Sequence, residues 1–141
     1  MYIVQKQTTM RNACVYIVNR HGYLLMLQCR HTRKWMTPGG RIDNYEHPWR
    51  CVVREFKEET NTDLPEYRCR LLHKCQWKDT MVYVIMLNYK FPDIFRPTNE
   101  TVNRRYIHYS KIQSMRNVKH YVKQSFADID IPSLVWTARQ F

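Results

Sequence analysis

Three carboxylates lie within little more than one helical turn of this sequence, at Glu55, Glu58 and Glu59. Positions i, i+3 and i+4 share one face of an α-helix, so the three side chains point in roughly the same direction. Like charges at these spacings repel one another by about 0.2–0.5 kcal/mol per pair. A bound cation would offset that repulsion, and converging carboxylate oxygens suit Mg²⁺ or Mn²⁺ rather than zinc. The spacing suggests a divalent-metal site, although a Glu-rich solvated helix surface would have the same pattern.

The segment that carries these carboxylates has the pattern of a helix packed on a core. Pro48 suits the first turn, and Asn61 suits the left-handed residue that follows the last turn. At 3.6 residues per turn, the carboxylates lie roughly 120° around the helix from an apolar stripe. The helix can therefore bury one side and direct its acids into a cleft. The stripe, at spacings i, i+3, i+4 and i+7, consists of Trp49, Val52, Val53 and Phe56.

The residues around this helix complete a longer pattern. Residues 40–62 resemble the Nudix box, G-x5-E-x7-R-E-U-x-E-E-x-G-U, in which U is a bulky aliphatic residue. Asn61 replaces the second glycine and Thr62 replaces the last aliphatic residue, so we expect Leu64 to supply the missing apolar contact. The positions that match are Gly40, Glu46, Arg54, Glu55, Glu58 and Glu59, with Phe56 at the first aliphatic position.

A sharp turn leads directly into this box. Trp35 to Gly40 is similar to the W-x-x-P-G-G segment of MutT-like Nudix proteins, and its glycines permit a close approach of the backbone. In that family a main-chain carbonyl from the turn helps to hold a metal ion. The resemblance therefore implies a carbonyl ligand from Gly39 or Gly40.

The resemblance also implies a reaction: hydrolysis of a pyrophosphate bond in a nucleoside diphosphate linked to another moiety, with Mg²⁺ or Mn²⁺ as cofactor. Glu55 and Glu59 are then the first metal ligands to expect. Glu58 is either a further ligand or the general base, because the base differs among subfamilies. Arg54 corresponds to the family arginine that orients the glutamates, and Glu46 lies where it would stabilise the helix start electrostatically.

Residues beyond the box could complete the site. Many family members recruit one more acid, and Glu100 lies in the loop where that acid is expected, with Asp79 and Asp93 as weaker candidates. Basic residues around the Trp-containing turn could grip phosphates, and aromatic side chains could stack on a base. The same residues would be equally ordinary as surface charges or core aromatics. The basic candidates are Arg30, Arg33, Lys34 and Arg41, and the aromatic ones are Trp35, Trp77 and Tyr83.

The length of 141 residues predicts a single Nudix-like domain over residues 1–141. We expect an α/β fold, a Nudix-type α/β/α sandwich with a curved mixed sheet and the box helix against it. The continuous apolar run at 81–87 predicts a buried central strand. Strands are expected at 2–10, 13–19, 23–30, 67–77, 80–91 and 104–109, helices at 110–115 and 118–127, and a docked apolar end at 132–141.

The net charge is +11 and the pI is about 9.6, which favours anionic partners such as polyphosphates or RNA. The five cysteines are scattered without a C-x-x-C pair, which indicates small core residues in a reducing compartment such as the cytoplasm. No apolar run reaches membrane-spanning length and the first residues lack a signal-peptide pattern, so we expect no membrane partner. Nothing in the sequence predicts an oligomeric state.

These patterns favour a Mg²⁺- or Mn²⁺-dependent Nudix hydrolase of nucleoside triphosphates or nucleotide derivatives. Capped RNA and other polyphosphates are the next substrates to consider, because of the strong positive charge. A different class of function is an inactive Nudix-fold module that binds RNA or a nucleotide, for which the altered Asn61 and Thr62 are the only support. A plain nucleic-acid-binding protein would be indifferent to Mg²⁺ and sensitive to salt.

Overall fold

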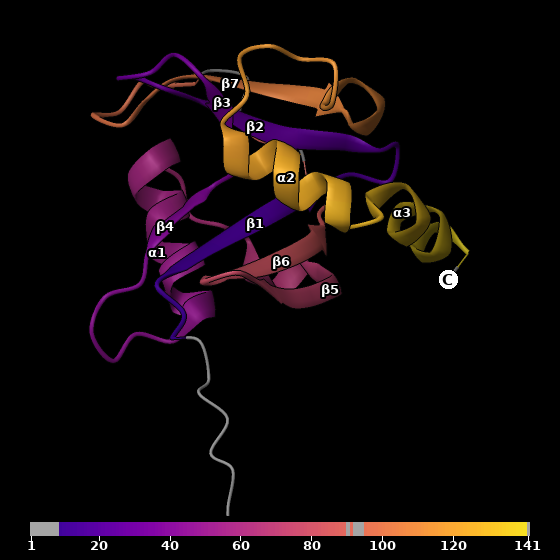
Figure 1. Cartoon of the computed structure of the whole chain (residues 1–141), viewed down its shortest axis with the longest axis horizontal. Coiled ribbons are helices and arrows are strands. Elements are labelled where there is room, and N and C mark those ends of the chain that lie inside the picture. The colour runs from indigo at the N-terminus through magenta and orange to yellow at the C-terminus, as the bar shows by residue number, and fades with distance from the viewer. Residues whose placement is uncertain (1–8, 90, 92–94, 141) are drawn as a thin grey trace, which may run out of the picture.

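The computed structural model describes residues 9–89, 91 and 95–140. None of the helices in this part of the chain is long and apolar enough to cross a membrane. In Figure 1 the sheet lies between α1 on one side and α2 with α3 on the other. The strands are β1 (Asn12–Val18), β2 (Tyr23–Cys29), β3 (Trp35–Met36), β4 (Gly39–Arg41), β5 (Arg70–Trp77), β6 (Thr80–Met86) and β7 (Thr101–His108). The α-helices are α1 (Pro48–Thr60), α2 (His120–Asp128) and α3 (Ile131–Arg139), and the short 3₁₀ helices are η1 (Glu66–Arg68) and η2 (Tyr109–Lys111).

The described strands form one mixed sheet with the order β3-β2-β1-β6-β5, in which β7 pairs with β2 and β4 pairs with β1. β1 and β6 run parallel along their whole length, beginning with Asn12 opposite Thr80. On its other edge β1 meets β2 only where Val18 lies opposite Leu24. β4 fills the space beside the start of β1, antiparallel to it. The divergence of β1 from β2 thus makes room for the two glycines of β4.

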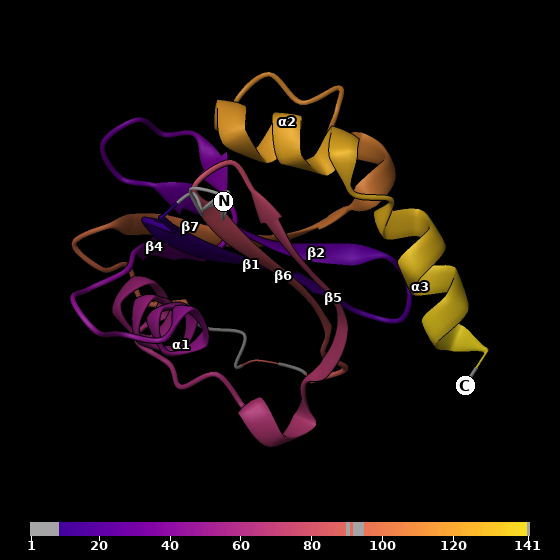
Figure 2. The same cartoon turned by 60° about the horizontal axis from the view of Figure 1, so that its bottom comes forward.

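The sheet face toward α1 forms one core. Alternate residues of β1 point to this face, because successive side chains of a strand lie on opposite sides of the sheet. Ala13, Val15 and Ile17 pack with Val52 and Phe56 of α1. This packing fixes the rotation of α1 about its axis, and the Glu55 carboxylate lies against Gly40 of β4. Figure 2 shows the helix beside β4.

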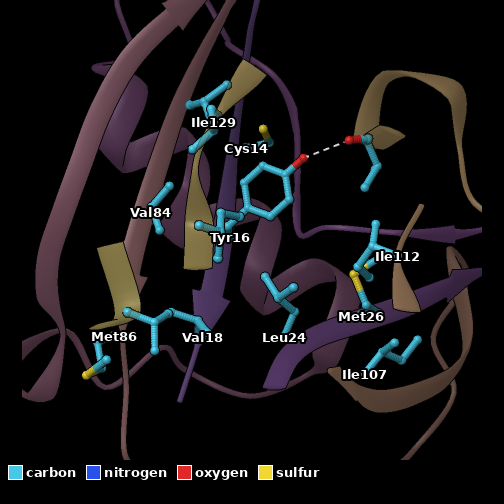
Figure 3. Packing of buried hydrophobic residues seen from close by; sticks show 14 of the residues in the cluster. Cys14, Tyr16, Val18, Leu24, Met26, Val84, Met86, Ile107, Ile112 and Ile129 are labelled. Atoms are coloured by element: carbon cyan, nitrogen blue, oxygen red, sulfur yellow. Dashed lines mark hydrogen bonds between the residues drawn. The ribbon is translucent and has the colours of Figure 1, made fainter. Parts of the chain in front are cut away.

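The other face packs against α2 and α3. Tyr16 is buried among Val18, Leu24 and Met26, and Figure 3 shows its ring between the strands and the helical layer. Its hydroxyl donates to the carbonyl oxygen of Val122 at 3.0 Å, which joins β1 to α2. The expected docking of residues 132–141 is confirmed for α3. The side chains that this helix buries against the sheet are Ile131, Val135 and Ala138.

α1 begins and ends at the expected residues, but its N-terminus is capped differently. The ring nitrogen Nδ1 of His47 accepts the backbone N–H of Trp49 at 3.1 Å, whereas Glu46 turns away to bind Arg54. At the other end Asn61 is left-handed, with φ 57°, as predicted. Leu64 is buried in the α1 core, as expected for the missing apolar contact of the box.

Several expected elements have other bounds in the structure. The strand expected at 67–77 begins at Arg70, after the 3₁₀ helix η1, and the strand expected at 80–91 ends at Met86. Residues 2–8 of the first expected strand lie outside the described residues, and residues 9–11 are not strand. The strand expected at 104–109 begins earlier, at Thr101, because β7 pairs with the whole of β2. The helix expected at 118–127 begins at His120.

The helix expected at 110–115 is wrong. Only the 3₁₀ helix η2 and turns occur there. Just beyond this stretch the chain pairs with β3: the backbone N–H of Trp35 donates to the Asn117 carbonyl at 2.6 Å, and the N–H of Lys119 donates to the Trp35 carbonyl at 2.9 Å. These bonds hold the chain beside β3 in an extended form that a continuing helix could not adopt.

The cysteines carry no disulfide: all five are free. Cys14, Cys29 and Cys51 are buried, as expected for small core residues, whereas Cys69 and Cys75 are only partly buried.

Candidate active site

The turn before α1 has glycine at two successive positions, and a Cβ at either one would meet other atoms. Gly39 has a φ of 153°, and a Cβ there would lie 2.4 Å from the carbonyl oxygen of Ala13. A Cβ on Gly40 would lie 2.4 Å from the carboxyl carbon of Glu55. β4 therefore approaches both β1 and the Glu55 carboxylate more closely than any residue with a side chain could.

Glu59 is held against this turn. Its Oε1 accepts the backbone N–H of Gly39 at 2.9 Å, and only 2% of the residue is exposed. Burial raises the pKa of Glu59 well above its usual value, and the nearby Glu55 and Glu100 carboxylates raise it further. The fold thus retains a carboxylate in a position where its ionised form lacks a sufficient counter-charge.

Arg54 joins the other box carboxylates. Its Nε and Nη2 each donate to Glu46 at 2.9 Å. Its Nη1 donates to Glu55 Oε1 at 3.0 Å and to Glu58 Oε1 at 3.2 Å, and its Nη2 donates to the Arg41 carbonyl at 3.0 Å. The hydrogen bonds from Arg54 lower the pKa of Glu46 to about 2, and those to Glu46 raise the pKa of Arg54 further above its already high value.

Glu55, Glu58 and Glu100 form a cluster of carboxylates. Each offers an oxygen within 4.8 Å of the others. Burial raises the pKa of Glu55 to about 7, and the charge of Glu58 adds to this more strongly than that of Glu100. Glu59 is a neighbour of this cluster and not a member of it. The structure thus brings Glu55, Glu58 and Glu100 together, with Glu59 next to them.

Glu100 reaches the cluster because its loop is fixed to the sheet and to α1. Arg30 donates from Nε and Nη2 to the Thr98 carbonyl at 3.0 and 2.7 Å, and its backbone N–H donates to the Glu100 carbonyl at 2.8 Å. The hydroxyl of Thr101 donates to the Glu59 carbonyl, which ties the same loop to the end of α1. The guanidinium of Arg30 is therefore engaged in holding the loop.

A cavity of about 680 Å³ opens beside these carboxylates. Glu55, Glu59 and Glu100 lie on one side of it, and Lys119 and Tyr121 from the start of α2 also line it. Lys119 is close enough to favour ionisation of Glu59. The remaining lining residues come from the sheet and its turns: Asn12, Ala13, Cys14, Cys29, His31, Met36, Gly39, Gly40, Trp77, Asp79 and Thr80.

No sequence pattern singled out Lys119 or Tyr121, because they lie more than fifty residues beyond the box and belong to no motif. A basic residue at a predicted helix start was the only available signal. Trp77 and Asp79 were both named from sequence, and both line the cavity through the turn between β5 and β6. Asp93 lies outside the described residues.

Several residues expected to bind substrate do not line the cavity. Arg30, Lys34 and Arg41 are not among its lining residues, although Lys34 and Arg41 are exposed. Arg33 occupies a left-handed turn position with φ 61°. Trp35 is 7% exposed and packs in the core under α2, with the Arg105 guanidinium 5.2 Å from its ring. Tyr83 packs edge-on against Trp49 on the α1 face, away from this cavity.

The donor set fits a hard divalent cation. Glu55, Glu58 and Glu100 supply oxygens close enough to share one ion, and such ions prefer carboxylate and carbonyl oxygens. The pKa values of Glu55 and Glu59 are raised because negative charge is buried there without a sufficient counter-charge. A bound cation would supply that counter-charge.

The family of the chain follows from a match to the NUDIX domain model over residues 8–126. The chain belongs to the Nudix family. As a family member it is a pyrophosphohydrolase of nucleoside diphosphate derivatives. No curated protein matches the sequence.

Solved Nudix structures have the same fold. The MutT protein of Methanosarcina mazei Go1 is 21% identical, with 92% of this chain and 99% of that chain covered and a TM-score of 0.65. The dihydroneopterin triphosphate pyrophosphohydrolase of E. coli is 17% identical, with 88% and 99% covered and a TM-score of 0.66. The Ap4A hydrolase of C. elegans is 20% identical, with 93% and 97% covered and a TM-score of 0.58. At these identities the likeness establishes the fold, and the expected α/β Nudix architecture is confirmed.

Proposed function

We propose that this chain hydrolyses a pyrophosphate bond of a nucleoside triphosphate or a related small nucleotide, with Mg²⁺ or Mn²⁺ as cofactor. The observation that supports this most directly is the approach of Glu55, Glu58 and Glu100 to within 4.8 Å of one another at the edge of a nucleotide-sized cavity. Small-molecule sites commonly enclose about 300–1,000 Å³, a range that includes this cavity.

The cation would be held by Glu55 and Glu100, with Glu59 and the carbonyl of Gly40 as further ligands, and Glu58 would lie beside it. When bound, it supplies charge neutralisation for the phosphates and makes a bound water easier to deprotonate. Glu59 is fixed by the Gly39 N–H, so one of its oxygens is held and its orientation is restricted. The rigid turn and the buried helix face thus set the ligand positions before the cation binds.

Arg54 acts as a positioning residue in this proposal. It binds Glu46 through two nitrogens, which fixes the guanidinium plane, and a third nitrogen contacts both Glu55 and Glu58. Glu58 is exposed and belongs to the cluster, so we assign it the role of accepting a proton from the attacking water. A base must come within hydrogen-bond reach of the water that it deprotonates, and Glu58 meets solvent more readily than the buried Glu55 or Glu59.

The cavity favours a compact anionic substrate. Lys119 lies on the wall as a cation for phosphate oxygens, and Trp77 and Tyr121 offer aromatic surface to a base. Arg41, which follows the lining residue Gly40 in the chain, would contact parts of the substrate that extend outside the cavity, and the exposed Lys34 is a second cation for this role. The M. mazei and E. coli neighbours are named as a MutT protein and a triphosphate pyrophosphohydrolase, which fits the same class.

The experiment is a panel of nucleoside triphosphates, nucleotide sugars, dinucleoside polyphosphates and capped RNA, each incubated with Mg²⁺, with Mn²⁺ and with EDTA. Product release is followed by chromatography, with Glu55→Gln protein as the matched control. We expect metal-dependent cleavage of a small nucleotide by the wild type alone. Cleavage of capped RNA in preference to every small nucleotide would replace the substrate assignment. Folded protein that binds a nucleotide and cleaves nothing would support an inactive binding module instead.

A further inference from the structure

The glutamate cavity has a second end, away from the carboxylate cluster. Asn12, Trp77, Asp79 and Thr80 line it there, around the start of β1 and the turn between β5 and β6. Asn12 of β1 lies opposite Thr80 of β6. The carbonyl of Asp79 accepts the backbone N–H of Asn12 at 3.2 Å, which fixes the turn to the start of β1. We call these four residues the turn end of the cavity.

The strand β1 separates the turn end from the glutamates. β4, whose Gly40 lies against the Glu55 carboxylate, pairs with one edge of β1, and β6 pairs with the other edge. Neighbouring strands lie about 4.8 Å apart, so β4 and β6 are separated by roughly 10 Å. A nucleotide can span this separation, with its phosphates at the glutamates and its base at the turn end.

Two hydrogen-bond donors near the turn end are already engaged. The indole N–H of Trp77 donates to Asp128 Oδ2 at 2.9 Å, and Lys78 Nζ lies 4.7 Å from the centre of the same ring. The hydroxyl of Tyr121, which lines the cavity from α2, donates to the Thr37 carbonyl at 3.3 Å. These side chains shape the wall of the cavity, and neither donor is free to identify a base.

Asp79 and Asn12 are the polar side chains that remain at this end. Within the described residues the Asp79 carboxylate forms no ion pair, and it accepts only the Thr80 hydroxyl at the long distance of 3.4 Å. In the same part of the chain the side-chain amide of Asn12 has no hydrogen-bond partner. The turn end therefore offers a carboxylate, which only accepts hydrogen bonds, beside an amide that both donates and accepts them.

We propose that Asp79 and Asn12 select guanine nucleotides as substrates. The Watson–Crick edge of guanine presents two adjacent donors, the N1–H and the 2-amino group, next to the O6 acceptor. A carboxylate can accept from both donors while an amide donates to O6. Adenine and cytosine present one amino group beside a ring-nitrogen acceptor, which repels a carboxylate, and uracil presents one donor between two carbonyls. This inference deepens the proposed hydrolysis and rests on it for the position of the phosphates.

Binding of nucleoside monophosphates tests the base contact apart from catalysis, because these ligands contain no pyrophosphate bond. Isothermal titration calorimetry in Mg²⁺ compares GMP with IMP, which lacks only the 2-amino group, and with AMP, CMP and UMP. The wild type should bind GMP about tenfold or more tightly than each of the others, as for one hydrogen bond to a charged group. Equal affinity for GMP and IMP, tighter binding of another base, or no binding of GMP would overturn the proposal.

Variants of the two residues assign the contacts. Asp79→Asn should weaken GMP binding about tenfold and IMP binding less, because IMP offers the carboxylate only one donor. Asn12→Ala should weaken GMP and IMP binding equally, because both bases carry O6. The matched control is Asp63→Asn, which removes a negative charge from an exposed residue that pairs with Lys57 and does not line the cavity. Equal losses in Asp79→Asn and Asp63→Asn would also overturn the proposal.

Cleavage of GTP, ITP, ATP, CTP and UTP by the same proteins separates this inference from the proposed function. We expect the highest kcat/KM for GTP in the wild type, and Asp79→Asn should reduce the advantage of GTP over ITP. Selective binding of GMP by protein that cleaves no triphosphate would retain the base site and overturn the proposed hydrolysis. Cleavage of all five triphosphates at similar kcat/KM would retain the hydrolysis and overturn the base site.

Discussion

At the scale of single residues, the site contains two kinds of carboxylate. Glu46 accepts hydrogen bonds from Arg54, which lower its pKa to about 2. It therefore stays ionised at neutral pH and holds the arginine. Glu55 and Glu59 are buried and have raised pKa values. The ionised Glu46 stabilises the folded chain through its pairing with Arg54. The ionised forms of Glu55 and Glu59 are favourable only when a cation binds beside them.

The raised pKa of Glu55 predicts how the stability of the metal-free protein depends on pH. The pKa is about 7 in the folded chain and 4.5 without the fold, so between these values the folded chain binds more protons than the unfolded chain. The free energy of unfolding should therefore fall as pH rises through this window, by about 3 kcal/mol from Glu55 if no ion is present. Glu59 contributes with the same sign.

Urea denaturation at pH 5 and pH 8 in EDTA measures this effect. Glu55→Gln should flatten the dependence, because the amide cannot ionise, and Mn²⁺ should restore stability to the wild type at pH 8. A metal-free wild type that is more stable at pH 8 than at pH 5 would contradict the assignment of Glu55 as an uncompensated buried carboxylate.

Kinetics can distinguish whether Glu58 acts as the general base or as a metal ligand. Glu58→Gln should lower kcat by about 10²-fold or more at saturating Mg²⁺, because a general base contributes roughly that much. The Mg²⁺ concentration for half-activation should change little, since Glu55 and Glu100 remain. If full activity returns at high Mg²⁺, Glu58 is a ligand and the base lies elsewhere.

At the scale of elements, the turn before α1 decides whether the carboxylates converge. Gly40→Ala would place a Cβ 2.4 Å from the Glu55 carboxyl carbon, and the side chain of Glu55 would have to move. We expect loss of most activity and weaker Mn²⁺ binding, with retained secondary structure by circular dichroism. Gly22→Ala is the control, because its positive φ of 87° imposes strain at a turn far from the site. Equal loss of activity in both variants would indicate general destabilisation.

The elements also show what sequence could and could not predict. The box helix was predictable, because its apolar stripe, Pro48 and Asn61 each specify a local feature that the structure retains. The N-cap was not, because Glu46 has a stronger partner in Arg54 and leaves His47 to accept the Trp49 N–H. Likewise, no local pattern encodes the hydrogen bonds that join Asn117 and Lys119 to Trp35 of β3, and the chain before them forms only η2 and turns.

At the scale of the whole molecule, the cavity joins distant parts of the chain. The glutamates come from the box and from the loop before β7, whereas Lys119 and Tyr121 come from the start of α2. Glu100 could be named from sequence because it is an isolated acid in a loop after the box. Lys119 could not be singled out among the 23 lysines and arginines, because its place depends on how α2 packs over β1.

Lys119 should contribute to substrate binding rather than to chemistry. Lys119→Ala is expected to raise KM for an anionic substrate about tenfold with little change in kcat, as for the loss of one hydrogen bond to a charged group. Lys123→Ala is the matched control, because Lys123 lies on the same helix but does not line the cavity. A fall in kcat at unchanged KM would assign Lys119 a role in the transition state instead.

The central claim is that the clustered glutamates bind a divalent cation that hydrolysis requires. The measurement that tests it most directly is turnover of the best nucleotide substrate as Mn²⁺ is titrated into metal-free protein, with Mn²⁺ binding followed in the same samples by electron paramagnetic resonance. We predict that activity rises with site occupancy in the wild type, and that Glu55→Gln loses both binding and activity while remaining folded. Turnover that is unchanged in EDTA, or Mn²⁺ binding that survives in Glu55→Gln, would contradict the account.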